Sequence, residues 1–174
     1  CHTFLENVDR VPNMNEALKA RMKAEARFIR AYLYFRLTTW FGDVPLFDHD
    51  LNLSESKSIA RTAQAQVLAF VRSELDAVAE ILPAKEKYAD TDKGRISSGA
   101  AVALKARTYL YSNDWGNVVT TCEKLINTDT YGKYSLFSSY EGLFLPANEY
   151  NSEVILDLNY VPSLRTWGNY YDFA

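Results

Sequence analysis

The spacing of apolar and polar residues predicts that most of this chain is helical. Over residues 16–41, charged and apolar positions each recur at intervals of three and four, which is typical of one long helix. Asn13 or Asn15 can cap its first turn, because an Asn side chain accepts a free backbone N–H there. Gly42 is expected to end it as a left-handed cap, and Pro45 then favours an extended exit.

This long helix carries two apolar stripes, so we expect an inner helix that packs on two sides. One stripe contains Phe28, Ala31, Phe35 and Thr38, and the other contains Leu18, Met22, Ile29, Leu33 and Trp40. The aromatic residues between Phe28 and Phe41 are therefore predicted to lie in the core. The later helices are expected to wrap this one.

Three further helices are predicted, and the last two form a hairpin. The first starts at a cap on Thr62 and runs through Leu82, where Pro83 stops it. Two shorter helices cover about 99–111 and 115–126, and the turn between them is so short that they must be antiparallel neighbours. The last helix is expected to direct these side chains inward: Val118, Val119, Cys122, Leu125 and Ile126.

Outside these helices the sequence is polar or irregular. Residues 2–9 have the pattern of the last turns of a helix, and residues 48–62 and 84–96 are predicted to be polar surface loops. Beyond the hairpin, a short helix is expected around 140–144. Residues 153–158 are the one stretch predicted to be a short strand or an extended run.

Two positions match the helix-pair repeat of tetratricopeptide proteins, in which a small residue precedes a Tyr by three positions. They are Ala31 with Tyr34 and Ala106 with Tyr109. The repeats are degenerate, because a long linker interrupts the first pair.

We therefore predict an all-α, tetratricopeptide-like (TPR) scaffold of helical pairs. It covers about residues 1–127, and an irregular, aromatic-rich segment covers about 128–174. Both belong to a single domain, 1–174.

Several motifs in one order resemble the SusD/RagB family. Residues 24–46, from Ala-Glu-Ala-Arg-Phe to the exit Gly-Asp-Val-Pro-Leu, resemble its signature helix, and residues 94–107 resemble its second signature. The stretch from Trp115 to Glu153-Val154-Ile155 follows the family's order with similar spacing. The resemblance covers almost the whole chain and suggests a central fragment of a SusD-like protein.

The resemblance implies a surface-exposed outer-membrane lipoprotein of Bacteroidota. Such proteins have a TPR-like scaffold with an irregular glycan-binding face. They sit on a SusC-like TonB-dependent transporter and deliver an oligosaccharide or polysaccharide to it. The signal and the lipid anchor, the only membrane attachment, are then expected upstream of this chain, and a long C-terminal part beyond Ala174. Cys1 would lie inside a helix and would not be the anchor.

Composition sets further limits on function. The net charge of -3 comes from interspersed signs without a block of Lys and Arg, so there is no electrostatic case for nucleic-acid binding. The two cysteines, Cys1 and Cys122, form no disulfide framework, and Cys122 is expected to be a small buried residue.

The sequence offers little support for catalysis. Asp48-His49-Asp50 has metal-ligand residue types, but adjacent residues converge poorly on one ion and the only other histidine is His2, so a solvated loop is expected. No phosphate-binding loop or nucleophile elbow occurs. We therefore expect no catalytic residues, cofactor or metal. A carboxylate pair for glycoside hydrolysis stays open, because the fold sets its spacing.

Residue types suited to sugar binding gather near the C-terminus, where aromatic rings alternate with amide and guanidinium groups. The candidate ligand-binding residues are Arg165, Trp167, Asn169, Tyr170 and Tyr171. A core or interface role for these aromatic side chains stays open.

The function predicted is non-enzymatic capture of a glycan at the cell surface for uptake. Three alternatives remain at this point. The chain could be only a scaffold for protein contacts, with the glycan site outside it. It could be an intracellular helical-repeat adaptor, or part of a glycan-degrading enzyme.

Overall fold

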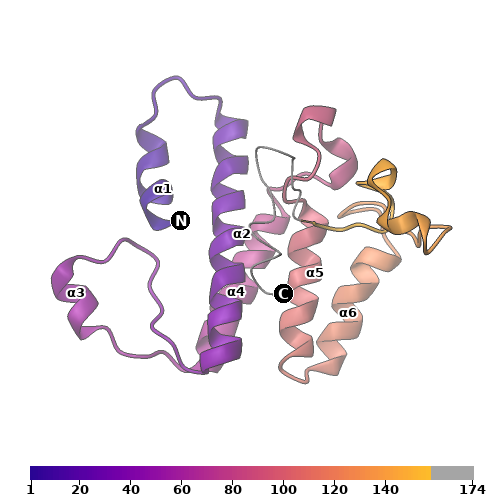
Figure 1. Ribbon diagram of the computed structural model, residues 1–174. Coiled ribbons are helices and arrows are strands. Elements are labelled where there is room, and N and C mark those ends of the chain that lie inside the picture. The colour runs from indigo at the N-terminus through magenta and orange to yellow at the C-terminus, as the bar shows by residue number, and fades with distance from the viewer. Residues whose placement is uncertain (158–174) are drawn as a thin grey trace, which may run out of the picture.

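The computed structural model describes residues 1–157, and these fold into helices joined by irregular segments (Figure 1). Within that range the sole β-type pairing is an isolated bridge between Val44 and Thr62, so the all-α prediction is confirmed. The helices are α1 (His2–Asn7), α2 (Glu16–Phe41), α3 (Leu53–Ser58), α4 (Gln64–Ala79), α5 (Ser98–Leu110) and α6 (Trp115–Ile126).

The four long helices pack in chain order as α2, α4, α5 and α6. Helix α1 lies beside α2 at one edge of this stack, and α5 and α6 form the antiparallel hairpin at the other edge (Figure 1). The predicted wrapping of α2 is therefore only partly right. Helix α4 packs directly on α2, whereas the hairpin packs on α4 and touches α2 only slightly.

The core is centred on α4, whose apolar stripe is the most completely enclosed surface in the described chain. Val67, Val71, Leu75 and Val78 have no solvent exposure at all. Small residues on both neighbours, Ala24 and Ala31 of α2 and Ala101 of α5, are equally buried and let the helices approach closely. This is the role that the repeat pattern predicts for Ala31.

The long helices α2 and α5 start at side-chain caps from the preceding residue, and α4 is capped from a distant turn. Asn15 caps α2 by accepting a hydrogen bond from the Leu18 amide at 2.9 Å, and Ser97 caps α5 in the same way. The predicted Thr62 cap is wrong. Helix α4 begins at Gln64, and its amide donates to the Asp43 carboxylate at 2.8 Å, so the turn after α2 supplies the cap.

The end of α2 depends on Gly42. Its φ of +69° lies where L side chains are strained, so glycine is required there. Its ψ of -120° differs from the predicted left-handed helical cap. The exit is fixed instead by Thr38, whose hydroxyl donates to the Gly42 carbonyl at 2.7 Å.

A buried ionic cluster joins α2 to α4. The Glu74 carboxylate accepts hydrogen bonds from both Arg27 and Arg30, each with one contact at 2.7 Å. Arg30 also donates to the Asp48 carbonyl at 3.1 Å and so holds the linker after α2. Burial raises the pKa of Glu74, but the two guanidinium groups outweigh it and hold the pKa below its ordinary value of 4.5.

Several predicted core residues are exposed in the described structure. Phe28, Tyr34 and Phe35 are buried as expected, but Trp40 is 69% and Phe41 65% exposed, because they lie on the side of α2 turned away from α4. The second apolar stripe of α2 is likewise largely uncovered, so within residues 1–157 the helix packs mainly on one side.

Three other expectations need correction. On α6, Val119 and Ile126 are exposed, Cys122 is only half-buried, and Thr121 is the buried residue. Residues 153–158 are predicted to be a short strand or an extended run, and the described part, 153–157, forms no strand. The expected helix around 140–144 is a short 3-10 turn, Gly142–Phe144.

The Glu74 cluster leads to a stability prediction. Glu74→Gln removes the charge that balances two guanidinium groups, and breaking a buried pair costs about 3–5 kcal/mol, which urea unfolding would measure. Because the folded pKa lies below the unfolded one, the carboxylate's contribution is complete above pH 4.5 and is lost as the pH falls further. The difference between wild type and variant should therefore shrink in acid.

Glu16→Gln is the matched control, because that carboxylate is 83% exposed in its pair with Lys19 and should contribute little. Equal stability of both variants at pH 7 would contradict a structural role for the cluster.

Candidate functional site

The sequence-predicted ligand residues Arg165, Trp167, Asn169, Tyr170 and Tyr171 lie outside the described residues 1–157. The described part of the irregular segment, 128–157, therefore carries the site geometry. It leaves α6, runs along the end of the helical stack and projects away from the helices (Figure 1).

The segment docks first on the start of α5, at Gly99. A Cβ at this glycine would lie 2.7 Å from the Tyr131 carbonyl and would overlap the Tyr134 ring. Ser98 donates to the same Tyr131 carbonyl at 3.3 Å. Because Gly99 has no side chain, Tyr131 and Tyr134 can pack directly on α5. Burial raises the pKa of the Tyr134 hydroxyl.

Lys85 is the main polar anchor of the returning chain. Its ammonium group donates to the carbonyls of Asn151, Ser152 and Val154 at 3.0, 3.2 and 3.1 Å. It also lies 4.4 Å from the centre of the Tyr134 ring, a cation–π distance. Burial lowers the pKa of Lys85, and the nearby Glu86 carboxylate partly opposes this shift.

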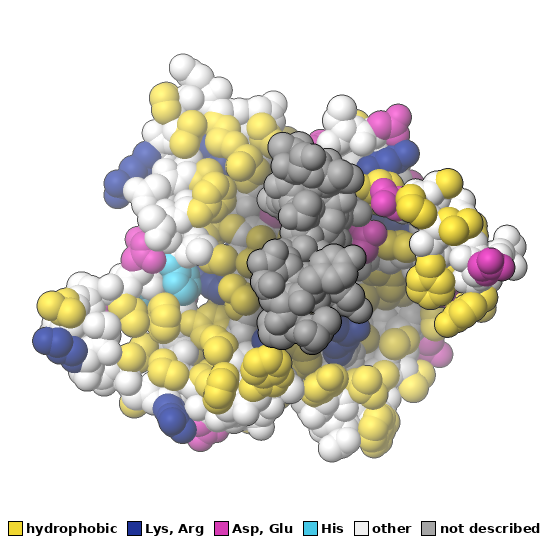
Figure 2. All heavy atoms as spheres, viewed as in Figure 1, with side chains coloured by type: hydrophobic (Ala, Val, Ile, Leu, Met, Phe, Trp, Pro, Cys, Tyr) yellow, Lys and Arg dark blue, Asp and Glu magenta, His cyan; other side chains and the backbone are white. Residues whose placement is uncertain are grey.

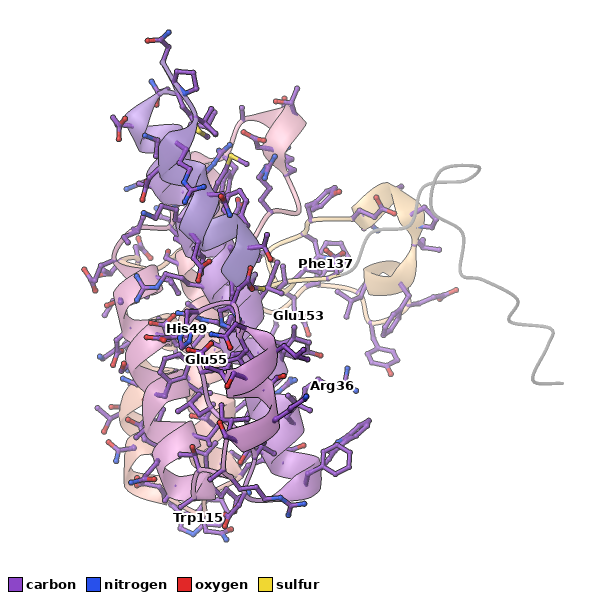
Figure 3. All side chains as sticks on the ribbon, turned by 90° about the vertical axis from the view of Figure 1, so that its left-hand side faces the viewer. Arg36, His49, Glu55, Trp115, Phe137 and Glu153 are labelled. Carbon is purple, nitrogen blue, oxygen red and sulfur yellow. The ribbon has the colours of Figure 1, made fainter. Side chains whose placement is uncertain are left out.

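The outgoing and returning parts of the segment are fastened to each other by a mixture of backbone and side-chain bonds. The Ser135 amide donates to the Ser152 carbonyl at 3.2 Å, and the Ser152 hydroxyl donates back at 3.0 Å. Two residues further out, the Phe137 amide donates to the Glu153 carboxylate at 2.9 Å, and the two residues face each other in Figure 3. These bonds close the base of a loop.

The loop, residues 136–150, exposes large apolar side chains; we call it the aromatic loop. Tyr140 is 82% and Phe144 69% exposed, and their rings meet edge to face with centroids 5.4 Å apart. Leu136 beside them is 86% exposed. Two polar bonds hold the turn: the Gly142 amide donates to Ser139, and the Asn148 side chain to the Gly142 carbonyl.

Such a surface can bind a flat, partly apolar ligand. Aromatic rings offer area at low conformational cost, and exposed apolar patches commonly mark binding surfaces. A cavity of about 230 Å³ lies nearer the scaffold, between the 84–96 loop and the returning chain. Its lining combines aliphatic side chains of residues 154–156 and the acidic Glu86 and Asp157 with cationic and phenolic groups: Lys85, Lys93, Arg95, Tyr88 and Tyr150.

The Asp48-His49-Asp50 stretch is a solvent-exposed turn, as its sequence predicts. His49 lies 3.1 Å from the Asp48 carboxylate and 3.7 Å from Glu55, with which it clusters in Figure 3. The hydrogen bond to Asp48 raises the pKa of His49. In the part of the chain that the structure describes, no three metal-type ligands converge. No helix there is both long and apolar enough for a membrane span.

Sequence reasoning missed the two residues that organise this site. Lys85 lies in a charged loop and Glu153 in an apolar-looking run, so neither stands out by composition. A signal was available for Lys85, because it lies two residues after the helix-stopping Pro83 and directly after the buried Ala84, so its stem starts beside the core. Only the fold shows that it points to the carbonyls of residues 151–154.

Gly99→Ala should weaken docking of the irregular segment. The new methyl group meets a backbone oxygen, and overpacking of this kind costs about 1–3 kcal/mol in thermal or urea unfolding. Gly116→Ala on α6 is the control, because nothing lies within 4 Å of its Cβ position. That change should stabilise the helix by about 0.5–1 kcal/mol. The same sign for both variants would contradict the proposed close contact.

Lys85→Met should free the returning chain while leaving the helices intact. Three carbonyls lose their donor, so amide hydrogen exchange in residues 134–157 should accelerate at least about tenfold, whereas exchange in α4 should not change. Lys87→Met, at an exposed position two residues away, is the comparison. Equal exchange in both variants would exclude Lys85 as the anchor.

Residues 1–110 match the SusD-like family model described as "Starch-binding associating with outer membrane". SusD-like protein P25 of Formosa agariphila is 32% identical over 162 residues, which cover 93% of this chain and 30% of that protein.

Solved structures show the same fold. A SusD-like protein of Bacteroides fragilis aligns with a TM-score of 0.82 at 29% identity, covering 94% of this chain and 31% of that one. A laminarin-binding SusD-like protein aligns with a TM-score of 0.82 at 30% identity, covering 92% and 35%. The chain thus spans about a third of the length of its relatives. With the family model matched over residues 1–110 and this helical stack, the chain belongs to the SusD-like family.

Proposed function

We propose that the protein to which this chain belongs binds a glycan at the cell surface without cleaving it, and passes it to a TonB-dependent outer-membrane transporter. The ligand class is an oligosaccharide or polysaccharide. The observation that carries the proposal is the family match over residues 1–110, because the family description names both starch binding and the outer membrane.

Relatives support a glucan as the ligand. The family description names starch, and one structure that shares 30% identity with this chain is described as laminarin-binding. Starch and laminarin are both chains of glucose whose pyranose rings have apolar C–H faces. Exposed aromatic side chains suit such faces, and the aromatic loop displays Tyr140 and Phe144 in this way.

The helical stack and the irregular segment have different roles in the proposed binding. The stack α2–α4–α5–α6 is a rigid support, because the apolar stripe of its central helix, α4, is completely buried. The irregular segment is fastened to it through Gly99 and Lys85, so side chains on that segment have defined positions. We assign ligand contact to the aromatic loop and to Arg165, Trp167, Asn169, Tyr170 and Tyr171 further along the chain.

Binding without catalysis agrees with how the nearby carboxylates are used. Glu153 accepts the Phe137 amide, and Glu86 accepts the Lys133 amide at 2.7 Å. Both therefore have structural partners. Attachment at the outer membrane and the handover to a transporter are proposed from the family description alone.

The test uses the full-length protein in affinity electrophoresis and calorimetry with laminarin and with starch. Binding of at least one glucan is expected. Replacing Trp167 and Tyr170 together by Ala, or Tyr140 and Phe144 together, should weaken it about tenfold or more, since each contributing ring is worth about 1 kcal/mol or more.

Trp115→Ala is the control, because this exposed tryptophan lies at the opposite end of the stack from Phe137 (Figure 3). Unchanged affinity in both double variants would place the glycan site outside this chain and favour a purely scaffolding role for it. Release of reducing sugar would overturn the non-enzymatic assignment, and absence of binding to any glycan would overturn the function.

A further inference from the structure

The side of α2 that faces away from α4 is built like a core surface but is uncovered within residues 1–157. Two parallel rows of side chains, each with a spacing of four residues, run along it. Both rows consist of exposed residues: Ile29, Leu33, Leu37 and Phe41 in one, and Tyr32, Arg36 and Trp40 in the other. We call this surface the α2 outer face. Figure 2 shows hydrophobic side chains gathered over α2 on this side.

The two rows have the geometry of a helix-packing site. Rows at spacing four form ridges on a helix, and the groove between two such ridges accepts a ridge from a second helix crossing at about -50°. A solvated helix side looks different. Near the start of α2, Glu16 is exposed and pairs with Lys19, and the partly exposed Lys23 pairs with Asp9.

An apolar groove extends this face toward the N-terminus of the chain. It has a volume of about 400 Å³ and lies between α1, α2 and the exit after Gly42. Its lining is mainly apolar and includes Leu33, Leu37, Val44, Pro45 and Phe47. The groove and the two rows share Leu33 and Leu37, so they form one continuous surface.

Arg36 gives this surface a positive charge that a binding partner would have to balance. Its guanidinium group lies between two rings of its own row, 5.8 Å from the centre of Tyr32 and 4.9 Å from that of Trp40, and it points away from α4 (Figure 3). Among residues 1–157 it has no ion-pair partner. Trp, Tyr and Arg are the residue types that dominate binding energy at interfaces.

The length of the relatives indicates what covers the face. This chain spans 30% of the Formosa agariphila relative and 31% of the Bacteroides fragilis structure, so about two thirds of a SusD-like protein lies outside it. A second copy fits less well. In a two-fold dimer the same patch meets itself, which would enclose two Arg36 cations in one interface with no acidic side chain of the patch to pair with them, and such unbalanced charge is costly.

We propose that the α2 outer face is the seat of an amphipathic helix contributed by the part of the SusD-like protein outside this chain. Leucine-sized side chains of that helix fill the groove between the two rows. An Asp or Glu of the same helix pairs with Arg36. This makes α2 an inner helix of the complete protein, packed on α4 on one side and on the incoming helix on the other.

Cysteine accessibility in the full-length protein tests the proposal. With all native cysteines replaced by serine, Leu33→Cys and Leu37→Cys would each be treated with a small maleimide under native and denaturing conditions. Both should react at least about a hundredfold more slowly when native, since they would be reached only through local opening. Glu16→Cys, at an exposed position of the same helix, should react at nearly the same rate in both states.

A photo-crosslinker identifies the covering segment. p-Benzoylphenylalanine at Phe41, on the rim of the face, should yield a crosslink to a helical peptide outside residues 1–174, in a product that keeps the monomer mass. In addition, Arg36→Glu should speed labelling at Leu33→Cys at least about tenfold by facing a carboxylate, while Arg36→Lys should not.

Other results would overturn the proposal. A product of dimer mass would mean that a second copy covers the face. A crosslink within residues 1–174 would mean that this chain covers it itself. Rapid native labelling at positions 33 and 37 would mean that the face stays open for a separate partner. Because no glycan is used, these results are independent of the proposed function.

Discussion

The arrangement of this chain depends on the ionic cluster in which the Glu74 carboxylate of α4 pairs with two arginines of α2. It is buried between two helices, and a buried carboxylate is tolerable only with full compensation. Arg27 and Arg30 of α2 supply it, and this fixes the register of the two helices. Arg30 also donates from Nη1 to the Asp48 carbonyl, so the same cluster places the linker that carries the chain from α2 to α4.

The irregular parts of the structure are held by the same device, a cation from the scaffold that satisfies backbone carbonyls. Lys85 does this for residues 151–154, and Arg30 of α2 does it for the linker after α2 through the Asp48 carbonyl at 3.1 Å. Such bonds are charge-assisted and satisfy acceptors that have no helical partner. They give loops fixed positions without regular secondary structure, which is what a binding surface on irregular chain requires.

Exposed aromatic residues have two different meanings in this molecule. On the aromatic loop, Tyr140 and Phe144 lie in a turn tied by polar bonds, and they suit a ligand with flat faces. On α2 the exposed residues form regular rows at spacing four, and they suit a second helix. We therefore assign the aromatic loop to ligand binding and the α2 outer face to helix packing because their backbones differ, one irregular and one helical, although their exposed side chains are of similar kinds.

The sequence by itself determined the four long helices, the short hairpin turn, Asn15 as one of two candidate caps and the family, because these depend on periodicity and on contacts between near neighbours. It did not reveal α3, which lies in a stretch predicted to be a surface loop. Only the tertiary structure decided the rest. Asp43 caps α4 in place of Thr62 because the bridge between Val44 and Thr62 brings the two ends of the linker together. Residues 153–157 form no strand, because no backbone ladder pairs with them in the described part of the chain. Which apolar stripe of α2 is buried depends on which helix reaches it, and periodicity reveals a stripe without naming its partner.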